Sequence, residues 1–243
     1  IKEVNPGYYC FESRPLLTAL DKITPNNVKN EYYLTDALHL IIAQGRKVVA
    51  ITAVPPEDCM GVNNRMQLSH VSKIMQERIQ SRLMESGVTI VDPPNTWIDV
   101  RAEIGQDTVI EPFTYIHGQV KVGQNCRIGP FAYLRDQTVL EDDVVLGVFT
   151  EVKSSILREG VRARHHSYLG DATVGRHVNV GAGSITANFD GQRILQTDIG
   201  DGSFIGSGAV LIAPLEIAAG RRVEPGSVVS KETAKQLGRE SEA

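Results

Sequence analysis

The sequence lacks the features that mark several specialised classes of protein. No apolar run approaches the roughly 20 residues that cross a membrane, and no signal peptide is visible. Its three cysteines, Cys10, Cys59 and Cys126, are odd in number and far apart, which fits a reducing compartment better than a disulfide framework. No low-complexity tract interrupts the chain. These absences predict a globular protein of the cytoplasm with no membrane partner.

The charge balance is also small, which excludes one further class of partner. Lys and Arg number 25 and Asp and Glu 29, so the net charge is −4. A chain with this balance has no general attraction for nucleic acid or for an anionic membrane. We therefore expect neither as a partner, and any anionic ligand must be held by local cations.

The first part of the chain alternates between helical and strand patterns. Residues 34–44 carry apolar side chains at helical spacing, and Gly45 is placed to end that helix. Residues 48–51 predict a short buried strand, and residues 8–11 are also strand-like. The alternation is typical of an α/β fold.

A second helix is expected after residue 64. Asn64 and Gln67 resemble a capping box, and the predicted helix ends at Gly87. Its apolar stripe consists of Leu68, Val71, Ile74, Met75, Ile79 and Leu83. We take residues 1–90 as one predicted domain, short for a complete doubly wound fold, with this helix as its link to the rest.

From about residue 100 the apolar residues repeat every six positions. Nine such positions follow one another from Ile104 to Val152. The series then continues to Val180, with a slip of one residue at two places, where the spacing is five instead of six. It resumes from Ile199 to Val229, beyond an interruption at residues 187–198 that predicts a loop. A six-residue period predicts a parallel β-helix in which three hexads close one coil. Residues 91–243 are therefore expected to form a mainly β domain, a left-handed parallel β-helix, with the hand taken from resemblance to known hexapeptide proteins.

Coil stacking places distant residues side by side. Residues three hexads apart lie about 4.8 Å from one another, the usual strand spacing. Arg135 and Lys153 are 18 residues apart and should stack on one face, either as two solvated charges or as a clamp for phosphate. After correction for the slip, Glu151 stacks under Tyr168.

A second group of residues gathers at a corner of the predicted coil. His165 should stack under Ala182, beside the glycine-rich turn at residues 181–184. Asn179 and Asn188 flank that turn. A lone histidine is more often structural than catalytic. Here, however, a carboxylate, two cations and open backbone N–H groups are expected near the imidazole, and this combination is typical of an acyl-transfer site.

Several short motifs resemble those of one enzyme family. The stretches AYLRDQ, TEVKSS, RHHSYLGDATVG, VNVGAGSITANFDG and FIGSGAVLIAP occur in order over residues 125–215. They resemble the acetyltransferase domain of the bacterial bifunctional N-acetylglucosamine-1-phosphate uridyltransferase and glucosamine-1-phosphate N-acetyltransferase. The resemblance implies acetyl transfer from acetyl-CoA to the amine of glucosamine-1-phosphate, on the route to UDP-N-acetylglucosamine for peptidoglycan and lipopolysaccharide. It also implies a homotrimer with sites shared between neighbouring coils.

The same resemblance implies a role for each candidate residue. His165 would be the general base, a task that suits a side chain titrating near neutrality, and Glu151 would orient it. The other implied roles are phosphate binding by Arg135 and Lys153, glucosamine binding by Tyr168, Asn179 and Asn188, and acetyl-CoA binding, largely through backbone, by Ala182 and Ser207.

The first part of the chain resembles the same enzyme. VNPGYYCF, NEYYLTD and GVNNR are similar to the later part of its uridyltransferase domain. There Asn63 matches a magnesium ligand and Asn5 a position near the sugar nucleotide, although Asn63 is equally well explained as part of a helix cap. No glycine-rich loop that cradles phosphates occurs in the chain. We therefore expect no uridyltransferase activity from this chain alone, and magnesium only where that domain is intact.

Departures from the family pattern leave alternatives open. Arg164, Phe189 and Val148 replace a frequent Asn, Tyr and Asn, and the C-terminal KETAKQLGRESEA lacks a longer basic tail. The replaced residues and the tail bear on CoA affinity and on the choice of acceptor. The alternatives are an acetyltransferase for another amino sugar or a nucleotide sugar, and a non-catalytic trimeric fragment. A carbon dioxide hydratase with zinc between chains is disfavoured, because its histidine spacing is not that of His117, His165, His166 and His177.

Overall fold

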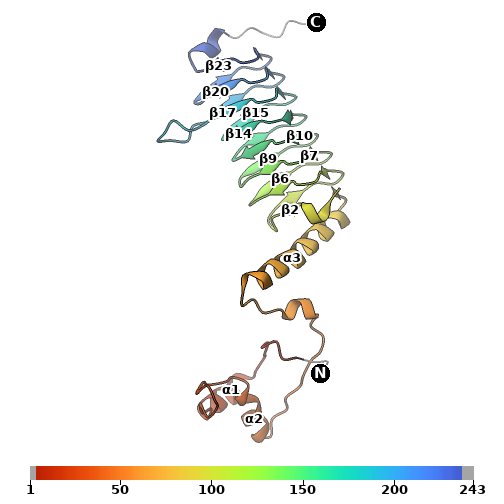
Figure 1. Ribbon diagram of the computed structural model, residues 1–243, viewed down its shortest axis with the longest axis vertical. Helices are drawn as coiled ribbons and strands as arrows, with labels where there is room; N and C mark the ends of the chain where they lie inside the picture. Colours follow the sequence, from red (N-terminus) through yellow and green to blue (C-terminus); the bar gives the residue numbers. More distant parts are fainter. Residues whose placement is uncertain (1–3, 237–243) are drawn as a thin grey trace. The chain divides into compact units, whose positions relative to one another are not determined.

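The computed structural model describes residues 4–236. The chain divides into two compact units, residues 1–72 and 73–243 (Figure 1). In the part of the chain described, every helix is too short or too polar to cross a membrane. The last seven residues of the C-terminal tail discussed above lie outside the described residues.

The first unit is built from helices. Helix α1 (Ser13–Leu20) packs on α2 (Asp36–Ala43), and a 3₁₀ turn, η1 (Pro56–Cys59), precedes the long helix α3 (Arg65–Glu85). The small core between α1 and α2 consists of Ala19, Ile23, Ala37 and Ile41. The predicted helix at residues 34–44 is confirmed as α2, and Gly45 beyond it has the positive φ of a helix-ending glycine. Helix α1 was not predicted.

Two strand predictions in this unit are wrong. Residues 48–51 and 8–11 have irregular backbone, and Ile51 is 76% exposed. A strand is stable only when a neighbouring strand satisfies its backbone groups. No strand occurs between residues 4 and 72, so neither segment has a partner there, and the predicted α/β alternation is not realised.

The predicted cap of α3 is confirmed. The Gln67 backbone N–H donates to Asn64 Oδ1 at 2.9 Å, and the Gln67 side chain accepts the Asn63 N–H at 2.7 Å. In the usual capping box the Gln67 side chain would accept the N–H of the N-cap residue, Asn64. Here it accepts the N–H of the residue before it, Asn63. Gly87 follows the helix with φ +97°.

The second unit is the parallel β-helix that the six-residue period predicts. Each strand pairs in parallel with the third strand along the chain, which gives three sheets of eight, eight and seven strands (Figure 1). Sheet A contains β1 (Thr89–Ile90), β4 (Val109–Ile110), β7 (Arg127–Ile128), β10 (Val145–Val148), β13 (Arg162–His165), β16 (Asn179–Val180), β19 (Phe204–Ile205) and β22 (Arg222–Val223). Sheet B contains β2 (Trp97–Ile98), β5 (Tyr115–Ile116), β8 (Tyr133–Leu134), β11 (Glu151–Lys153), β14 (Tyr168–Gly170), β17 (Ile185–Ala187), β20 (Val210–Ile212) and β23 (Val228–Val229). Sheet C contains β3 (Glu103–Ile104), β6 (Val120–Val122), β9 (Thr138–Leu140), β12 (Ile156–Leu157), β15 (Ala172–Val174), β18 (Thr197–Ile199) and β21 (Leu215–Ile217).

The core of the β-helix is the periodic series itself. The predicted inward positions from Ile110 to Val229 are buried, and only Ile104 is partly exposed. Each buried Val, Leu or Ile contributes about 1.5–3 kcal/mol relative to an exposed one. The coil begins at Thr89, earlier than predicted. The 3₁₀ turn η2 (Pro93–Asn95) lengthens the first repeat beyond six residues, so the six-residue spacing is not visible there in the sequence. The predicted loop is confirmed between β17 and β18.

The C-terminal half of α3 closes the open end of the coil. Gln76 donates to the Ile98 carbonyl at 2.8 Å and accepts the Ile98 N–H at 2.9 Å, and Gln80 donates to the Thr96 carbonyl at 2.7 Å. Both glutamines are buried. They satisfy backbone groups in β2 and just before it, which a neighbouring coil would satisfy elsewhere in the β-helix.

We predict that Gln76→Leu lowers the free energy of unfolding by about 2 kcal/mol or more, because it leaves a buried N–H and a buried carbonyl unpaired. Denaturant unfolding followed by circular dichroism, at fixed protein concentration, measures the effect. The control is Glu77→Leu on the exposed side of the same helix. Equal unfolding midpoints for the two variants would contradict the capping role.

Candidate functional site

The two predicted phosphate-binding cations lie level with each other on sheet B. Val152 pairs with Leu134, and the Arg135 N–H donates to the Val152 carbonyl at 2.8 Å, so Arg135 and Lys153 stack as predicted. Each is nevertheless paired with a carboxylate. Arg135 Nη1 lies 2.9 Å from Glu151 Oε1, and Lys153 Nζ lies 3.7 Å from Asp171 Oδ2. The site is therefore a group of mixed charge rather than two cations alone.

Tyr168 and Asn188 join this group. Glu151 pairs with Tyr168 in neighbouring coils, as the sequence predicts. Asn188 Nδ2 donates to the Tyr168 hydroxyl at 3.3 Å and also to Asp171 Oδ2. A Cβ at Gly170 would lie 2.4 Å from the Tyr168 hydroxyl, so glycine there lets the tyrosine fold back over its own strand. The base of the loop after β17 is thereby joined to the charged face of sheet B.

One hydrogen bond of the group stabilises a cation. The hydrogen bond from Arg135 to Glu151 raises the pKa of the guanidinium above its ordinary value, so this cation persists at any accessible pH. The Lys153 side chain is 27% exposed and Asp171 only 14%. The Lys153 ammonium is therefore held partly out of water beside the Asp171 carboxylate. A ligand that binds here contacts both charges.

Asp171 is the residue of this group that sequence reasoning missed. The strand register could have indicated it, because Lys153 pairs with Gly170 and Asp171 is the next residue. The Asp171 N–H donates to the Lys153 carbonyl at 3.0 Å. Counting the coil one residue further would have placed this carboxylate beside the lysine.

His165 lies at the end of β13, where it pairs with Val148 of β10. Its side chain is exposed and makes no hydrogen bond, ion pair or ring contact with the other predicted site residues in the described part of the chain. The adjacent His166 stacks on Phe149 with ring centroids 5.0 Å apart. Glu151 pairs with Arg135 and makes no hydrogen bond to His165 in this single chain, so its orienting role stays a prediction.

The backbone at Ala182 is open, as an acyl-transfer site requires. Val180 pairs with Ala163 below and Ile205 above, which places Ala182 between the levels of His165 and Ser207. The Ala182 carbonyl accepts the Gly208 N–H at 2.7 Å. Within residues 4–236 the Ala182 N–H donates to no protein group, so it remains available to a ligand.

The two predicted flanking asparagines lie on different faces. Asn179 belongs to sheet A, where it pairs with Arg162 and Phe204. Asn188 lies beside Tyr168 of sheet B. One chain thus brings together Arg135, Glu151, Lys153, Tyr168 and Asn188, and it places His165, Ala182, Ser207 and Asn179 in a separate group around the corner and on sheet A.

Metal ligation has little support in the residues described. No group of three or more His, Cys, Asp or Glu between residues 4 and 236 is placed to hold an ion. Asn63 is exposed and takes part, through its backbone, in the cap of α3. The predicted magnesium role of Asn63 therefore stays a prediction for an intact uridyltransferase domain.

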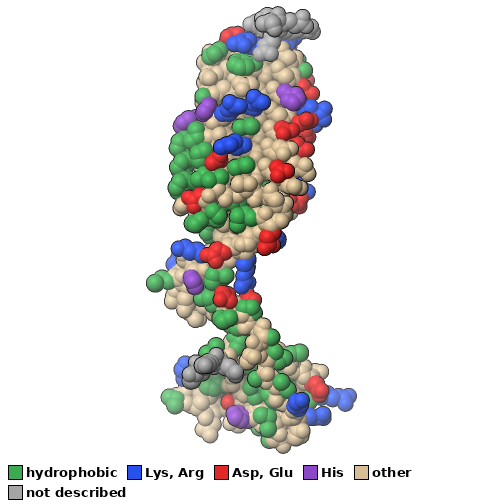
Figure 2. Space-filling model, turned by 90° about the vertical axis from the view of Figure 1, so that its right-hand side faces the viewer, with side chains coloured by type: hydrophobic (Ala, Val, Ile, Leu, Met, Phe, Trp, Pro, Cys, Tyr) green, Lys and Arg blue, Asp and Glu red, His purple; other side chains and the backbone are tan. Residues whose placement is uncertain are grey.

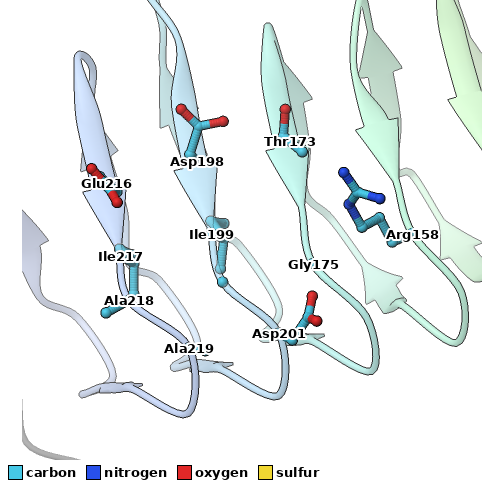
Figure 3. A pocket seen from close by; sticks show the side chains of 11 residues that line it. Arg158, Thr173, Gly175, Asp198, Ile199, Asp201, Glu216, Ile217, Ala218 and Ala219 are labelled. Atoms are coloured by element: carbon cyan, nitrogen blue, oxygen red, sulfur yellow. The ribbon is translucent and has the colours of Figure 1, made fainter.

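A shallow hollow of about 240 Å³ lies on sheet C. Figure 3 shows Asp198 and Glu216 on neighbouring strands along it, with Arg158 two coils away. Arg158 lies 3.7 Å from Glu141. The hollow contains none of the predicted site residues, and its two stacked carboxylates are unsuited to an anionic substrate.

Part of the β-helix matches a known family of repeats. Residues 101–136 match the bacterial transferase hexapeptide family of six repeats. The bifunctional protein GlmU of Limosilactobacillus fermentum is 44% identical over 96% of this chain and 58% of its own length. This chain is a homologue of the bifunctional GlmU proteins.

Other GlmU proteins give the same result. Those of Geobacillus thermodenitrificans and Heliobacterium modesticaldum are 41% and 39% identical, over 95% and 96% of this chain. The chain spans somewhat more than half the length of these GlmU relatives, 57% and 58%.

Two solved structures of acetyltransferases are less similar in sequence than the GlmU proteins. The acetyltransferase domain of PglB from Neisseria gonorrhoeae, in complex with acetyl coenzyme A, is 17% identical and covers 76% of this chain and 83% of its own, with a TM-score of 0.40. GDP-perosamine N-acetyl transferase from Caulobacter crescentus is 13% identical and covers 65% and 66%, with a TM-score of 0.38.

Proposed function

We propose that this chain transfers the acetyl group of acetyl-CoA to the amine of glucosamine-1-phosphate. The observation that carries the proposal is the mixed-charge group on sheet B, next to a corner with an exposed histidine and a free backbone N–H. Glucosamine-1-phosphate carries an ammonium and a phosphate. A site with paired carboxylates and cations matches both charges, whereas a purely basic clamp would repel the ammonium.

The acceptor is held by the sheet B group in this proposal. Arg135 and Lys153 turn from Glu151 and Asp171 to the phosphate, because a phosphate dianion carries two negative charges and each carboxylate carries one. The Tyr168 hydroxyl and the Asn188 amide, already joined at 3.3 Å, hold sugar hydroxyls. Glu151, released from Arg135, is then free to orient His165.

The reaction takes place at the corner. His165 accepts a proton from the glucosamine ammonium, and the free amine attacks the thioester carbonyl of acetyl-CoA. The Ala182 N–H, with Ser207 one coil above, stabilises the oxyanion of the tetrahedral intermediate. The C–S bond then breaks, an amide remains, and CoA leaves as a thiol after taking up a proton.

The two groups of site residues are completed by neighbouring copies in a homotrimer. An exposed aromatic ladder, Phe113, Phe131 and Phe149, runs along one edge of the coil, with ring centroids 4.8 and 5.1 Å apart. Figure 2 shows hydrophobic side chains gathered along one edge of the β-helix. Stacked exposed aromatics of this extent are typical of a surface that another chain covers. Analytical ultracentrifugation measures the assembly.

The deciding experiment offers the protein acetyl-CoA together with a panel of amines. The panel is glucosamine-1-phosphate, glucosamine-6-phosphate, glucosamine and UDP-glucosamine, and free thiol release is the readout. The proposal requires that glucosamine-1-phosphate gives the highest kcat/KM. Preference for a nucleotide sugar would favour the alternative acceptor class, and no turnover of any amine would favour a non-catalytic role.

We predict that Lys153→Ala raises the KM for glucosamine-1-phosphate about ten-fold or more, because one of two phosphate contacts is lost. The KM for acetyl-CoA should change by less than about two-fold. Initial-rate kinetics with each substrate varied in turn measures both constants. Lys121→Ala, on sheet C beside Glu103, is the control. An effect on the CoA constant alone would contradict the phosphate assignment.

A further inference from the structure

Two arginines on sheet A differ from the other cations of the coil. Of the Lys and Arg side chains that belong to described strands, Lys121, Arg127, Lys153 and Arg222 each contact a carboxylate. Arg162 and Arg164 of β13 contact none within residues 4–236. The fold thus neutralises its strand cations everywhere that is described except at this one strand.

The neighbours of these arginines leave their charge uncompensated. Arg162 lies between Val145 of the coil below and Asn179 of the coil above. Arg164 lies level with two glycines. Gly181 follows Val180, the partner of Ala163, and Gly147 lies so close below that a Cβ on it would come within 1.8 Å of the Arg164 carbonyl. Neutral and glycine neighbours keep both guanidinium groups open to solvent and to a ligand.

The spacing of the two arginines suits a single phosphate group. They are two residues apart on one strand, with buried Ala163 between them, so both side chains point to the same face about 6.6 Å apart along the backbone. Two guanidinium groups at this spacing can donate to different oxygens of one phosphate. The face is sheet A, whereas Arg135 and Lys153 belong to the sheet B group, so this is a different position from the proposed clamp.

The strand also leads directly to the proposed base. His165 follows Arg164 in β13, at the corner where the acyl donor and the amine would meet. A single phosphate on the acceptor is already assigned to Arg135 and Lys153. A second phosphate near the same corner belongs to a nucleotide-bearing ligand, either the CoA donor or a nucleotide sugar.

We propose that Arg162 and Arg164 form a second phosphate-binding site, which holds a phosphate of a nucleotide-bearing ligand while its reactive end lies at the His165 corner. The inference rests on the proposed function for its choice of ligands.

The test measures binding without turnover, so it stands or falls separately from the proposed acetyl transfer. The variant is Arg162→Gln with Arg164→Gln, and the control is Arg176→Gln, an exposed arginine 4.0 Å from Glu159. Isothermal titration uses CoA, 3′-dephospho-CoA and UDP-N-acetylglucosamine as probes. We expect the variant to bind at least one of CoA and UDP-N-acetylglucosamine about ten-fold more weakly than the control does.

The probes identify the source of the phosphate. A loss for CoA assigns the site to the donor, and a smaller loss for 3′-dephospho-CoA assigns it to the 3′-phosphate. A loss for UDP-N-acetylglucosamine assigns it to a nucleotide sugar. Affinities within two-fold of the control for all three probes overturn the proposal. A changed mass in light scattering with unchanged affinities would instead assign the arginines to a contact between copies, and would overturn it equally.

Discussion

Replacement of His165 by alanine is expected to lower kcat for acetylation of glucosamine-1-phosphate by about 10²–10⁴-fold at pH 7. Without a base at the corner, the attacking amine must lose its proton to water. Both KM values should stay within a few-fold, because the acceptor contacts on sheet B do not involve His165. Steady-state kinetics measures the loss.

The control for this variant is His117→Ala. His117 is also exposed on the coil, where it stacks on Tyr115 with ring centroids 6.0 Å apart. It should retain the kcat of the parent protein. A correctly folded His165→Ala protein with near-normal turnover would remove His165 as the base.

Replacement of Gly147 by alanine is expected to lower the free energy of unfolding by about 3 kcal/mol or more. The added Cβ would lie 1.8 Å from the Arg164 carbonyl oxygen, and 2.5 Å from its carbonyl carbon. Backbone atoms of the neighbouring coil cannot rotate away as a side chain can, so β10 and β13 must separate. The thermal midpoint should fall on the order of 10 °C.

Gly61→Ala is the matched control. No atom lies within 4 Å of a Cβ built there, and its φ is not positive. Differential scanning calorimetry of the two variants measures the contrast. Equal midpoints would show that the coils tolerate a wider separation at this position. Because β13 carries Arg162, Arg164 and His165, the Gly147→Ala protein should also lose affinity for whichever of CoA and UDP-N-acetylglucosamine the two arginines bind.

The coil itself could be predicted from the sequence because a β-helix is nearly one-dimensional. Each coil contacts only its neighbours, so one inward aliphatic residue per hexad is both the local signal and the tertiary core. The register then follows by counting. It correctly placed Arg135 level with Lys153, Glu151 level with Tyr168, and Ala182 two residues beyond the partner of Ala163.

The first unit could not be predicted equally well. Residues 48–51 have the composition of a buried strand, but strand formation depends on a partner that the local sequence does not reveal. Helix α2 was predictable, because its hydrogen bonds and its terminating glycine lie within one segment. The difference is that a helix satisfies its backbone internally, whereas a strand does not.

The sequence by itself therefore determined the period, the inward residues, the loop and the levels at which candidate site residues stand. Only the tertiary structure decided which side chains form hydrogen bonds and ion pairs with one another. It paired Glu151 with Arg135 rather than His165, added Asp171 to Lys153, and buried Gln76 and Gln80 at the open end of the coil. The physical reason is that a period fixes backbone positions, while hydrogen bonds and ion pairs depend on side-chain rotamers and on backbone groups left unpaired.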